Sequence, residues 1–172
     1  GLSMIVLDTN VLSELLRSLQ VTDRQGTVLP LDEGAKRAVG LILAVRAASG
    51  KVMLIGNGGS AAIASHMQND LCKAADVRAL VFNEPPLLTA LSNDDGYGSV
   101  FERPVELWAT PGDLLLAISS SGRSENILRA SRRAATQGCD VITLSGFSAD
   151  NPLRGMGTIN FYVPSPVYGY VE

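Results

Sequence analysis

The chain has 172 residues, of which 46% are hydrophobic and 18% charged, and its formal net charge is −3. This length and composition are typical of one globular domain and exclude an intrinsically disordered chain. The negative charge and the lack of a lysine or arginine cluster argue against a nucleic-acid partner. No apolar run reaches the roughly 20 residues that span a bilayer, and no signal peptide is evident. We therefore expect a cytoplasmic protein with no membrane partner.

The first 19 residues allow two interpretations. Residues 4–15 resemble the first strand and helix of PIN-domain ribonucleases, in which the aspartate at the strand end, here Asp8, binds a divalent metal. That site needs further carboxylates, and none follows in a suitable context. The alternative is an N-terminal helix, because leucines recur with helical spacing: Leu12, Leu15, Leu16 and Leu19.

The rest of the chain alternates between strands, turns and helices. Residues 23–30 are polar and predict a loop, and residues 93–96 predict a turn. Hydrophobic periodicity and flanking Gly and Pro residues predict helices at 32–49, 60–73, 87–91, 99–108 and 124–137, and strands at 52–56, 77–82, 113–118, 139–144 and 158–163. The alternation predicts an α/β fold, a doubly wound five-stranded parallel sheet flanked by helices. We expect a single domain over 1–172, with an N-terminal helical segment at 1–50 and the sheet core at 51–172.

A glycine-rich corner follows the strand at 52–56. It reads Asn57-Gly58-Gly59-Ser60 and leads into an alanine-rich helix, with Ser60 as the predicted N-cap. Such a corner directs backbone N–H groups and the positive end of a helix dipole at one point, where a phosphate can bind. The same residue types also begin ordinary helices, so this loop alone does not decide between a binding site and a turn.

A second loop of similar character follows the strand at 113–118. It reads Ser119-Ser120-Ser121-Gly122-Arg123-Ser124. Ligands of parallel sheets bind beyond the carboxyl ends of the strands, so we expect the two loops to cooperate. Hydroxyls and backbone N–H groups can satisfy the oxygens of a phosphomonoester without a lysine. A dinucleotide site is not indicated, because the glycines of the first loop do not follow its G-x-G-x-x-G pattern.

Four segments resemble the sugar isomerase (SIS) domain of the phosphoheptose isomerase family in their order and spacing. They are GNGGSAAIASHMQNDL at 56–71, LLTALSNDDGYGSVF at 87–101, GDLLLAISSSGRSENILRA at 112–130 and VITLSGF at 141–147. The resemblance implies an isomerase that interconverts a ketose and an aldose phosphate, of the sedoheptulose 7-phosphate kind, through an enediol. It further implies a role in lipopolysaccharide or capsule precursor synthesis. It also implies a homotetramer or dimer of dimers with active sites shared between subunits.

The family's functional residues can be carried across position by position. Its sugar-phosphate contacts fall on Asn57, Gly58, Ser60, Asp94, Ser119, Ser120, Ser121 and Ser124. Its helical histidine, often a metal ligand, falls on His66, and the glutamate proposed as catalytic base and metal ligand falls on Asp70. Four residues apart, His66 and Asp70 share a helix face and could hold a divalent metal such as zinc, or act together on a substrate. Taken alone, a single helical histidine is more often a packed or solvent-facing residue.

Two departures from the family pattern affect the expected chemistry. Asp70 replaces a glutamate, so its carboxylate is one methylene shorter. The sequence also ends at Glu172, where the family's last helix begins and brings a Gln or Glu and a histidine to the site. Glu172 could match that first acidic residue, but the histidine has no counterpart, and we expect the final helix to be absent. A non-catalytic SIS module that binds a sugar phosphate or a protein partner is therefore the alternative function.

Overall fold

The computed structural model describes the backbone of residues 2–171 and the side chains of residues 9–171. Glu172 and the side chain of Asp8 lie outside the described residues. The helices are α1 (Leu2–Arg17), α2 (Leu31–Ala47), α3 (Gly59–Ala74), α4 (Pro85–Asp95), α5 (Glu102–Trp108), α6 (Glu125–Thr136) and α7 (Tyr168–Val171), with 3-10 turns η1 (Tyr97–Ser99) and η2 (Pro152–Gly155). The strands are β1 (Gln20–Asp23), β2 (Val28–Leu29), β3 (Val52–Ile55), β4 (Ala79–Val81), β5 (Leu114–Ser119), β6 (Asp140–Ser145) and β7 (Ile159–Tyr162).

The strands form one mostly parallel sheet in the order β2-β1-β7-β6-β5-β3-β4. The five strands from β7 to β4 run parallel, which confirms the predicted α/β class and the five-stranded parallel core. Each of these strands begins and ends within two residues of its predicted range. Parallel strands are buried on both faces and therefore have continuous apolar sequences, which is why these strands could be located from the sequence.

The predicted loop at 23–30 is wrong, because the structure has a hairpin there. β1 pairs antiparallel with β7 and with β2, so the sheet gains two strands within the first 50 residues. The turn is held by the carboxylate of Asp23, which accepts N–H groups from Gln25 and Thr27 at 2.9 Å each. Strands this short, joined by polar residues, leave almost no periodic signal in the sequence.

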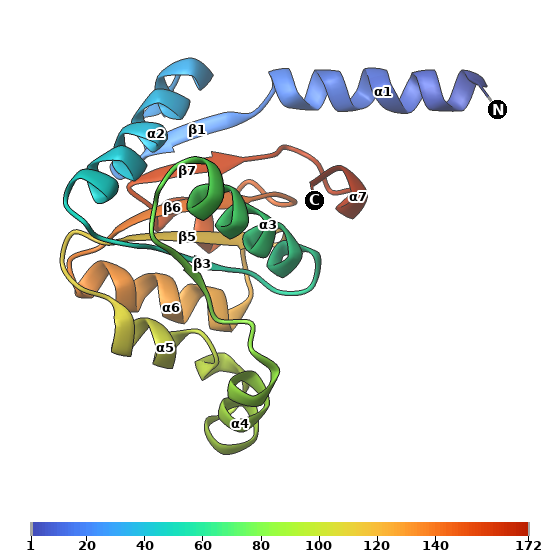
Figure 1. The fold of residues 1–172 in the computed structure, drawn as a ribbon. Helices are drawn as coiled ribbons and strands as arrows, with labels where there is room; N and C mark the ends of the chain where they lie inside the picture. Colours follow the sequence, from blue (N-terminus) through green and yellow to red (C-terminus); the bar gives the residue numbers. More distant parts are fainter. Residues whose placement is uncertain (1, 172) are drawn as a thin grey trace.

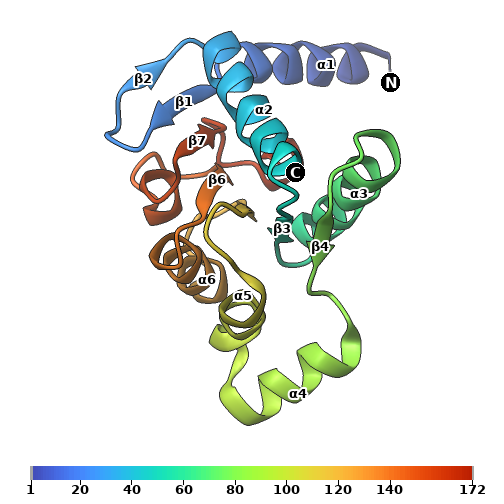
Figure 2. The ribbon, with the colours of Figure 1, turned by 60° about the vertical axis from the view of Figure 1, so that its left-hand side comes forward.

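Helices cover both faces of the sheet, as Figures 1 and 2 show. On one face, Val45 of α2 and Ala64 and Leu71 of α3 pack on strand residues such as Leu54 and Leu116. On the other face, α5 and α6 pack on the alternate strand residues, including Met53, Ile55, Leu115, Ala117 and Val141. The period of two along each strand thus separates two apolar cores.

The N-terminal residues form a helix, which confirms the helical interpretation. α1 covers residues 2–17, and the nuclease interpretation requires a strand over part of the same segment. Figure 1 shows α1 extending away from the end of β1. Leu12 and Leu16 on this helix are exposed. Among the described residues, no helix combines the length and the apolar character needed to cross a membrane.

The predicted turn at 93–96 and the short helix at 87–91 are corrected by the structure. One helix, α4, runs from Pro85 to Asp95 and ends at Gly96, which has a φ of +81°. Pro85 and Pro86 occupy the first turn of α4, where proline costs no hydrogen bond.

The amino-terminal side of the central strands carries a buried ion pair. The Asp113 carboxylate, 2% exposed, accepts hydrogen bonds from the Lys51 ammonium at 2.6 Å and from the Thr110 hydroxyl at 2.8 Å. It also accepts the backbone N–H groups of Lys51 at 3.0 Å and Thr110 at 2.8 Å. Burial acts to raise the pKa of Asp113, but these hydrogen bonds outweigh it and lower the pKa below its usual value.

We expect Asp113→Asn to destabilise the fold by about 3 kcal/mol at pH 7, since it leaves the Lys51 ammonium without its buried partner. Because the pKa of Asp113 is lower in the folded than in the unfolded state, its ionised carboxylate stabilises the fold at pH values above its unfolded pKa of about 4. This stabilisation is lost as the pH falls through the pKa of the folded state. The difference between the wild type and the variant should therefore shrink from pH 7 to pH 3. Urea unfolding at both pH values measures this difference in the free energy of unfolding.

Glu33→Gln, which removes an exposed carboxylate paired with Arg37, is the control and should lower the free energy of unfolding by less than about 1 kcal/mol. A difference for Asp113→Asn that is independent of pH would contradict the assignment.

Candidate functional site

A small pocket of about 140 Å³ lies beyond the carboxyl ends of β3 and β5. We call it the serine pocket. Its lining consists of Asn57, Ser60, Ile118, Ser119, Ser120, Ser121, Ser124, Phe147 and Tyr168. Six of the eight predicted substrate-binding residues therefore meet in one place. They come together because β3 and β5 are adjacent parallel strands, so the loops that follow them lie side by side.

The first loop is shaped by close contact between the end of β3 and α3. A Cβ at Gly56 would lie 2.6 Å from the backbone carbon and oxygen of Ser60, so only glycine fits there. Gly58, with a φ of +55°, is the N-cap and α3 begins at Gly59, so the prediction that Ser60 is the N-cap is wrong. Ser60 lies in the first turn of the helix and is 3% exposed. The first N–H groups of α3 have no partner within the helix and point out of its amino-terminal end. Asn57, which lines the pocket, lies at this end.

The second loop is fixed by hydrogen bonds within itself and to the segment behind it. The Ser119 hydroxyl oxygen accepts the N–H of Gly122, and the Ser121 hydroxyl oxygen accepts the N–H of Arg123, each at 3.2 Å. Gly122 has a φ of +63°, and a Cβ there would lie 1.9 Å from Oδ1 of Asn151. Asn151 is itself buried and held by further hydrogen bonds. The loop is therefore ordered by its own chain before any ligand is present.

The serine pocket is polar without being charged. Among the described residues, none of the side chains that line it is ionisable near neutral pH. The adjacent Arg123 pairs instead with Asp150 at 2.9 Å, and both side chains are more than half exposed. An anion in this pocket would be stabilised by hydroxyls, an amide and the amino ends of α3 and α6, as expected for a phosphate site without a lysine.

His66 and Asp70 lie together on α3, away from the serine pocket. Nε2 of His66 is 3.5 Å from Oδ2 of Asp70, and the two side chains are 78% and 58% exposed. Neither lines the serine pocket. The described residues contain no cluster of three or more His, Cys, Asp or Glu side chains that could hold a metal ion. The pair therefore offers two donors to an ion, whereas zinc sites usually have three or four protein ligands.

The other two predicted contacts also lie outside the serine pocket. Gly58 lines a neighbouring pocket of about 220 Å³, together with Asn57, Ser65 and Tyr97 among others. Asp94 lies at the exposed end of α4, where its carboxylate accepts a hydrogen bond of 2.9 Å from Asn93.

Two aromatic residues of the serine pocket were missed by sequence reasoning. Phe147 follows β6 and has a φ of +57°, a backbone conformation that residues other than glycine rarely adopt. Its N–H donates to the Ser165 carbonyl at 3.0 Å, and its carbonyl accepts the Tyr162 hydroxyl at 2.8 Å. The Tyr168 ring lies with its centroid 6.4 Å from that of Phe147. An aromatic residue just after a strand end in the segment VITLSGF was the available signal.

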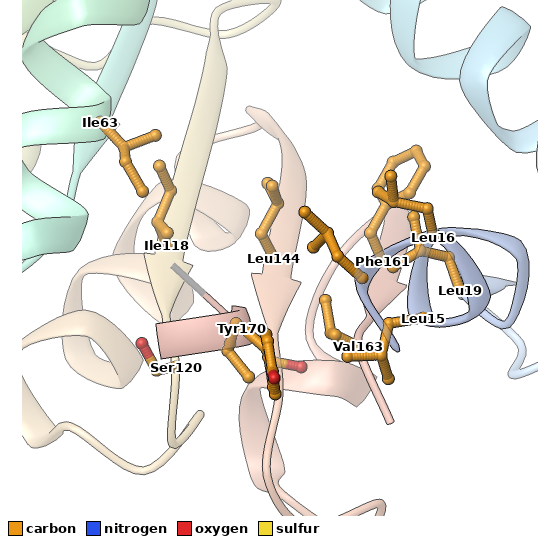
Figure 3. A pocket seen from close by; sticks show the side chains of 13 residues that line it. Leu15, Leu16, Leu19, Ile63, Ile118, Ser120, Leu144, Phe161, Val163 and Tyr170 are labelled. Atoms are coloured by element: carbon orange, nitrogen blue, oxygen red, sulfur yellow. The ribbon is translucent and has the colours of Figure 1, made fainter. Parts of the chain in front are cut away.

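A larger pocket of about 340 Å³ lies next to the serine pocket and shares Ile118 and Ser120 with it. Figure 3 shows leucines of α1, including Leu15 and Leu16, on one side and Ile63 and Ile118 on the other. This lining is almost entirely aliphatic or aromatic. It offers a phosphate few donors, so the serine pocket is the candidate anion site.

Comparison with known proteins agrees with this geometry. A family model for the SIS domain matches residues 29–146. The chain is 36% identical over 159 residues to the phosphoheptose isomerase of a Bradyrhizobium species, which covers 89% of this chain and 78% of the relative. It is 40% identical over 151 residues to that of Mycobacterium tuberculosis, covering 80% and 74%. The solved structure of the phosphoheptose isomerase from Neisseria gonorrhoeae superposes with a TM-score of 0.84 at 26% identity, over 98% of this chain and 89% of that one.

Proposed function

This chain belongs to the phosphoheptose isomerase family of SIS-domain proteins, and we propose that it isomerises sedoheptulose 7-phosphate to an aldose heptose phosphate. The observation that carries the proposal is the serine pocket, in which two donor-rich loops from adjacent strands converge. Its size and its donors suit the phosphate group of a monoester. The product would serve the synthesis of lipopolysaccharide or capsule precursors, and that role would place the protein in the cytoplasm.

In this proposal the serine pocket anchors the phosphate. Hydroxyls of Ser119, Ser121 and Ser124 and the amide of Asn57 are the polar side chains that would contact its oxygens, with Ser60 and Ser120 completing the lining. Binding energy at the phosphate, far from the reacting carbons, fixes the orientation of the sugar chain. Gly58 and Asp94 would contact the hydroxyl-bearing part of the substrate.

Asp70 is the proposed general base and His66 the proposed proton shuttle. Isomerisation removes a proton from C1 of the ketose, forms an enediol and returns a proton to C2, while a proton moves between the oxygens on C1 and C2. A carboxylate can take and return the carbon-bound proton, and an imidazole can move the proton between the oxygens. Their separation of 3.5 Å allows the two groups to act on neighbouring atoms.

The position of Asp70 supports an active site shared between subunits. Asp70 follows Ser60 by ten positions along α3, which corresponds to about 15 Å at 1.5 Å per residue. An extended seven-carbon chain anchored in the serine pocket is shorter than this. Because Asp70 and His66 are also exposed, we propose that they serve a substrate held by the serine pocket of a second subunit in a homodimer or homotetramer.

A divalent ion such as zinc would be held by His66 and Asp70. They supply two donors, and the described residues do not complete a metal site.

The proposal is tested by following sedoheptulose 7-phosphate with the wild-type protein by NMR. Appearance of an aldose heptose phosphate is the expected result. Fructose 6-phosphate, which lacks one carbon, is the matched substrate control and should be converted more slowly. Binding of sedoheptulose 7-phosphate with no conversion would instead identify a non-catalytic SIS module and overturn the isomerase proposal.

A further inference from the structure

The side chain of Asn57 is held by a buried partner on a different element, helix α6. Nδ2 of Asn57 donates to Oδ1 of Asn126 at 3.0 Å, and Nδ2 of Asn126 donates to Oδ1 of Asn57 at 2.9 Å. Asn126 lies in the first turn of α6, two residues after Ser124, and is 2% exposed. The phenol of Tyr97 adds a third bond, donating to Oδ1 of Asn57 at 2.9 Å.

These bonds fix which way the Asn57 amide points. Its oxygen receives two donors and one of its two N–H bonds is used by Asn126. An amide has four hydrogen-bonding positions, so one N–H remains for a ligand. Asn57 lines the serine pocket. If the amide were reversed, its nitrogen and oxygen would face the nitrogen and oxygen of the Asn126 amide, whose own orientation is fixed because its Oδ1 accepts the Ile127 N–H at 2.9 Å.

The pair also connects the two loops of the pocket. Asn57 precedes α3, which packs on one face of the sheet, and Asn126 lies on α6, which packs on the other. Their reciprocal bonds pass over the carboxyl ends of β3 and β5, the adjacent strands that carry the loops. One pair of side chains therefore links the first loop to the start of α6, just after Ser124.

Ordinary core polar residues of the same helix behave differently. Ser131 is 1% exposed, and its hydroxyl donates to the carbonyl of Ile127 one turn earlier, at 2.8 Å. That bond stays within α6 and reaches no loop. Asn126 places its amide against a residue 69 positions away. Buried amides are costly unless they are paired, and an apolar residue would fill the same place without aligning Asn57.

We infer that Asn126 is a positioning residue for the phosphate site, acting through Asn57, with Tyr97 as a second support. Neither residue contacts the phosphate in this account. Asn126 holds the Asn57 amide with its free N–H toward the pocket. The inference rests on the proposed function of the serine pocket, and it assigns a role to two residues outside that lining.

A double-mutant cycle with phosphate binding as readout tests the inference. Calorimetry measures binding of inorganic phosphate and of sedoheptulose 7-phosphate to the wild type and to Asn57→Ala, Asn126→Ala, the double variant, Tyr97→Phe and Ser131→Ala. Loss of one aligned hydrogen bond predicts roughly five- to tenfold weaker binding for Asn126→Ala and about threefold weaker binding for Tyr97→Phe. Ser131→Ala, the control on the same helix, should bind as the wild type does.

The expected signature is coupling between the two asparagines. In the Asn57→Ala background, Asn126→Ala should weaken binding by less than about twofold, because its effect passes through Asn57. In turnover assays, Asn126→Ala should raise KM and leave kcat within about twofold, since the anchor is used equally in ground and transition states. Additive losses, or unchanged binding in both Asn126→Ala and Tyr97→Phe, would overturn the inference.

The proposed function and this inference fail in different ways. A wild-type protein that binds phosphate but never converts the sugar would contradict the isomerase proposal and leave the cycle interpretable. Because Tyr97 is 56% exposed, Tyr97→Phe removes a bond without disturbing the core. It therefore tests the inference even if Asn126→Ala does not fold.

Discussion

Asp70→Asn is expected to lower kcat for sedoheptulose 7-phosphate by about 10³, since a general base contributes roughly 10² to 10⁴. The variant keeps the size of the side chain and removes its ability to take a proton. Asp70 lies outside the serine pocket and is 58% exposed, so the fold and the phosphate anchor should be unaffected. Steady-state kinetics and calorimetry with inorganic phosphate measure the two properties separately, and binding should stay within about twofold of the wild type.

Asp32→Asn is the matched control, since it makes the same chemical change at another exposed helix position. Its kcat should equal that of the wild type. An unaltered kcat in Asp70→Asn would remove Asp70 as the base. Loss of phosphate binding in that variant would instead show that Asp70 also supports the phosphate anchor.

Gly56→Ala is expected to abolish measurable phosphate binding and to destabilise the fold by about 3 kcal/mol. The added Cβ would lie 2.6 Å from the backbone of Ser60, and a backbone neighbour cannot move aside as a flexible side chain can. Overpacking of a tight site costs about 1–3 kcal/mol or more. The only relief is to move α3 away from β3, which displaces Asn57 and Ser60 together.

Gly40→Ala provides the control for this substitution. Gly40 lies within α2, and a Cβ added there would meet no atom within 4 Å. In a helix interior, alanine is more favourable than glycine by up to about 1 kcal/mol. Urea unfolding should show a stable or slightly stabilised protein that binds phosphate normally. If Gly56→Ala resembled Gly40→Ala in both measurements, the close contact between β3 and α3 would not shape the loop.

The parallel core could be predicted because each of its strands is a short apolar run followed by a turn. For example, residues 52–55 and 114–118 are buried throughout, so hydrophobic runs and glycines carried the information. The β1–β2 hairpin could not be predicted in this way, since β2 has only two residues and the turn depends on the Asp23 side chain.

Convergence of the two loops followed from strand topology, and the structure places Asn57 with Ser119 as expected. The distance of Asp70 from the serine pocket could not be predicted. Helical spacing predicts that Asp70 lies beside His66, but it does not predict how far the pair lies from a pocket. Asn126 was also missed. Its pairing with Asn57 joins residues 69 positions apart, and no local pattern encodes such a contact.

In the proposed reaction, this protein moves a carbon-bound proton of a sugar phosphate whose phosphate is held in the serine pocket. Incubation of the wild-type protein with sedoheptulose 7-phosphate in D₂O, followed by mass spectrometry and NMR of the recovered sugars, tests it most directly. An enediol exchanges its proton with solvent through the base, so we predict deuterium at C2 of the aldose product and at C1 of recovered ketose, with none in the Asp70→Asn reaction. Recovery of bound but fully protonated sugar from the wild-type protein would contradict the account.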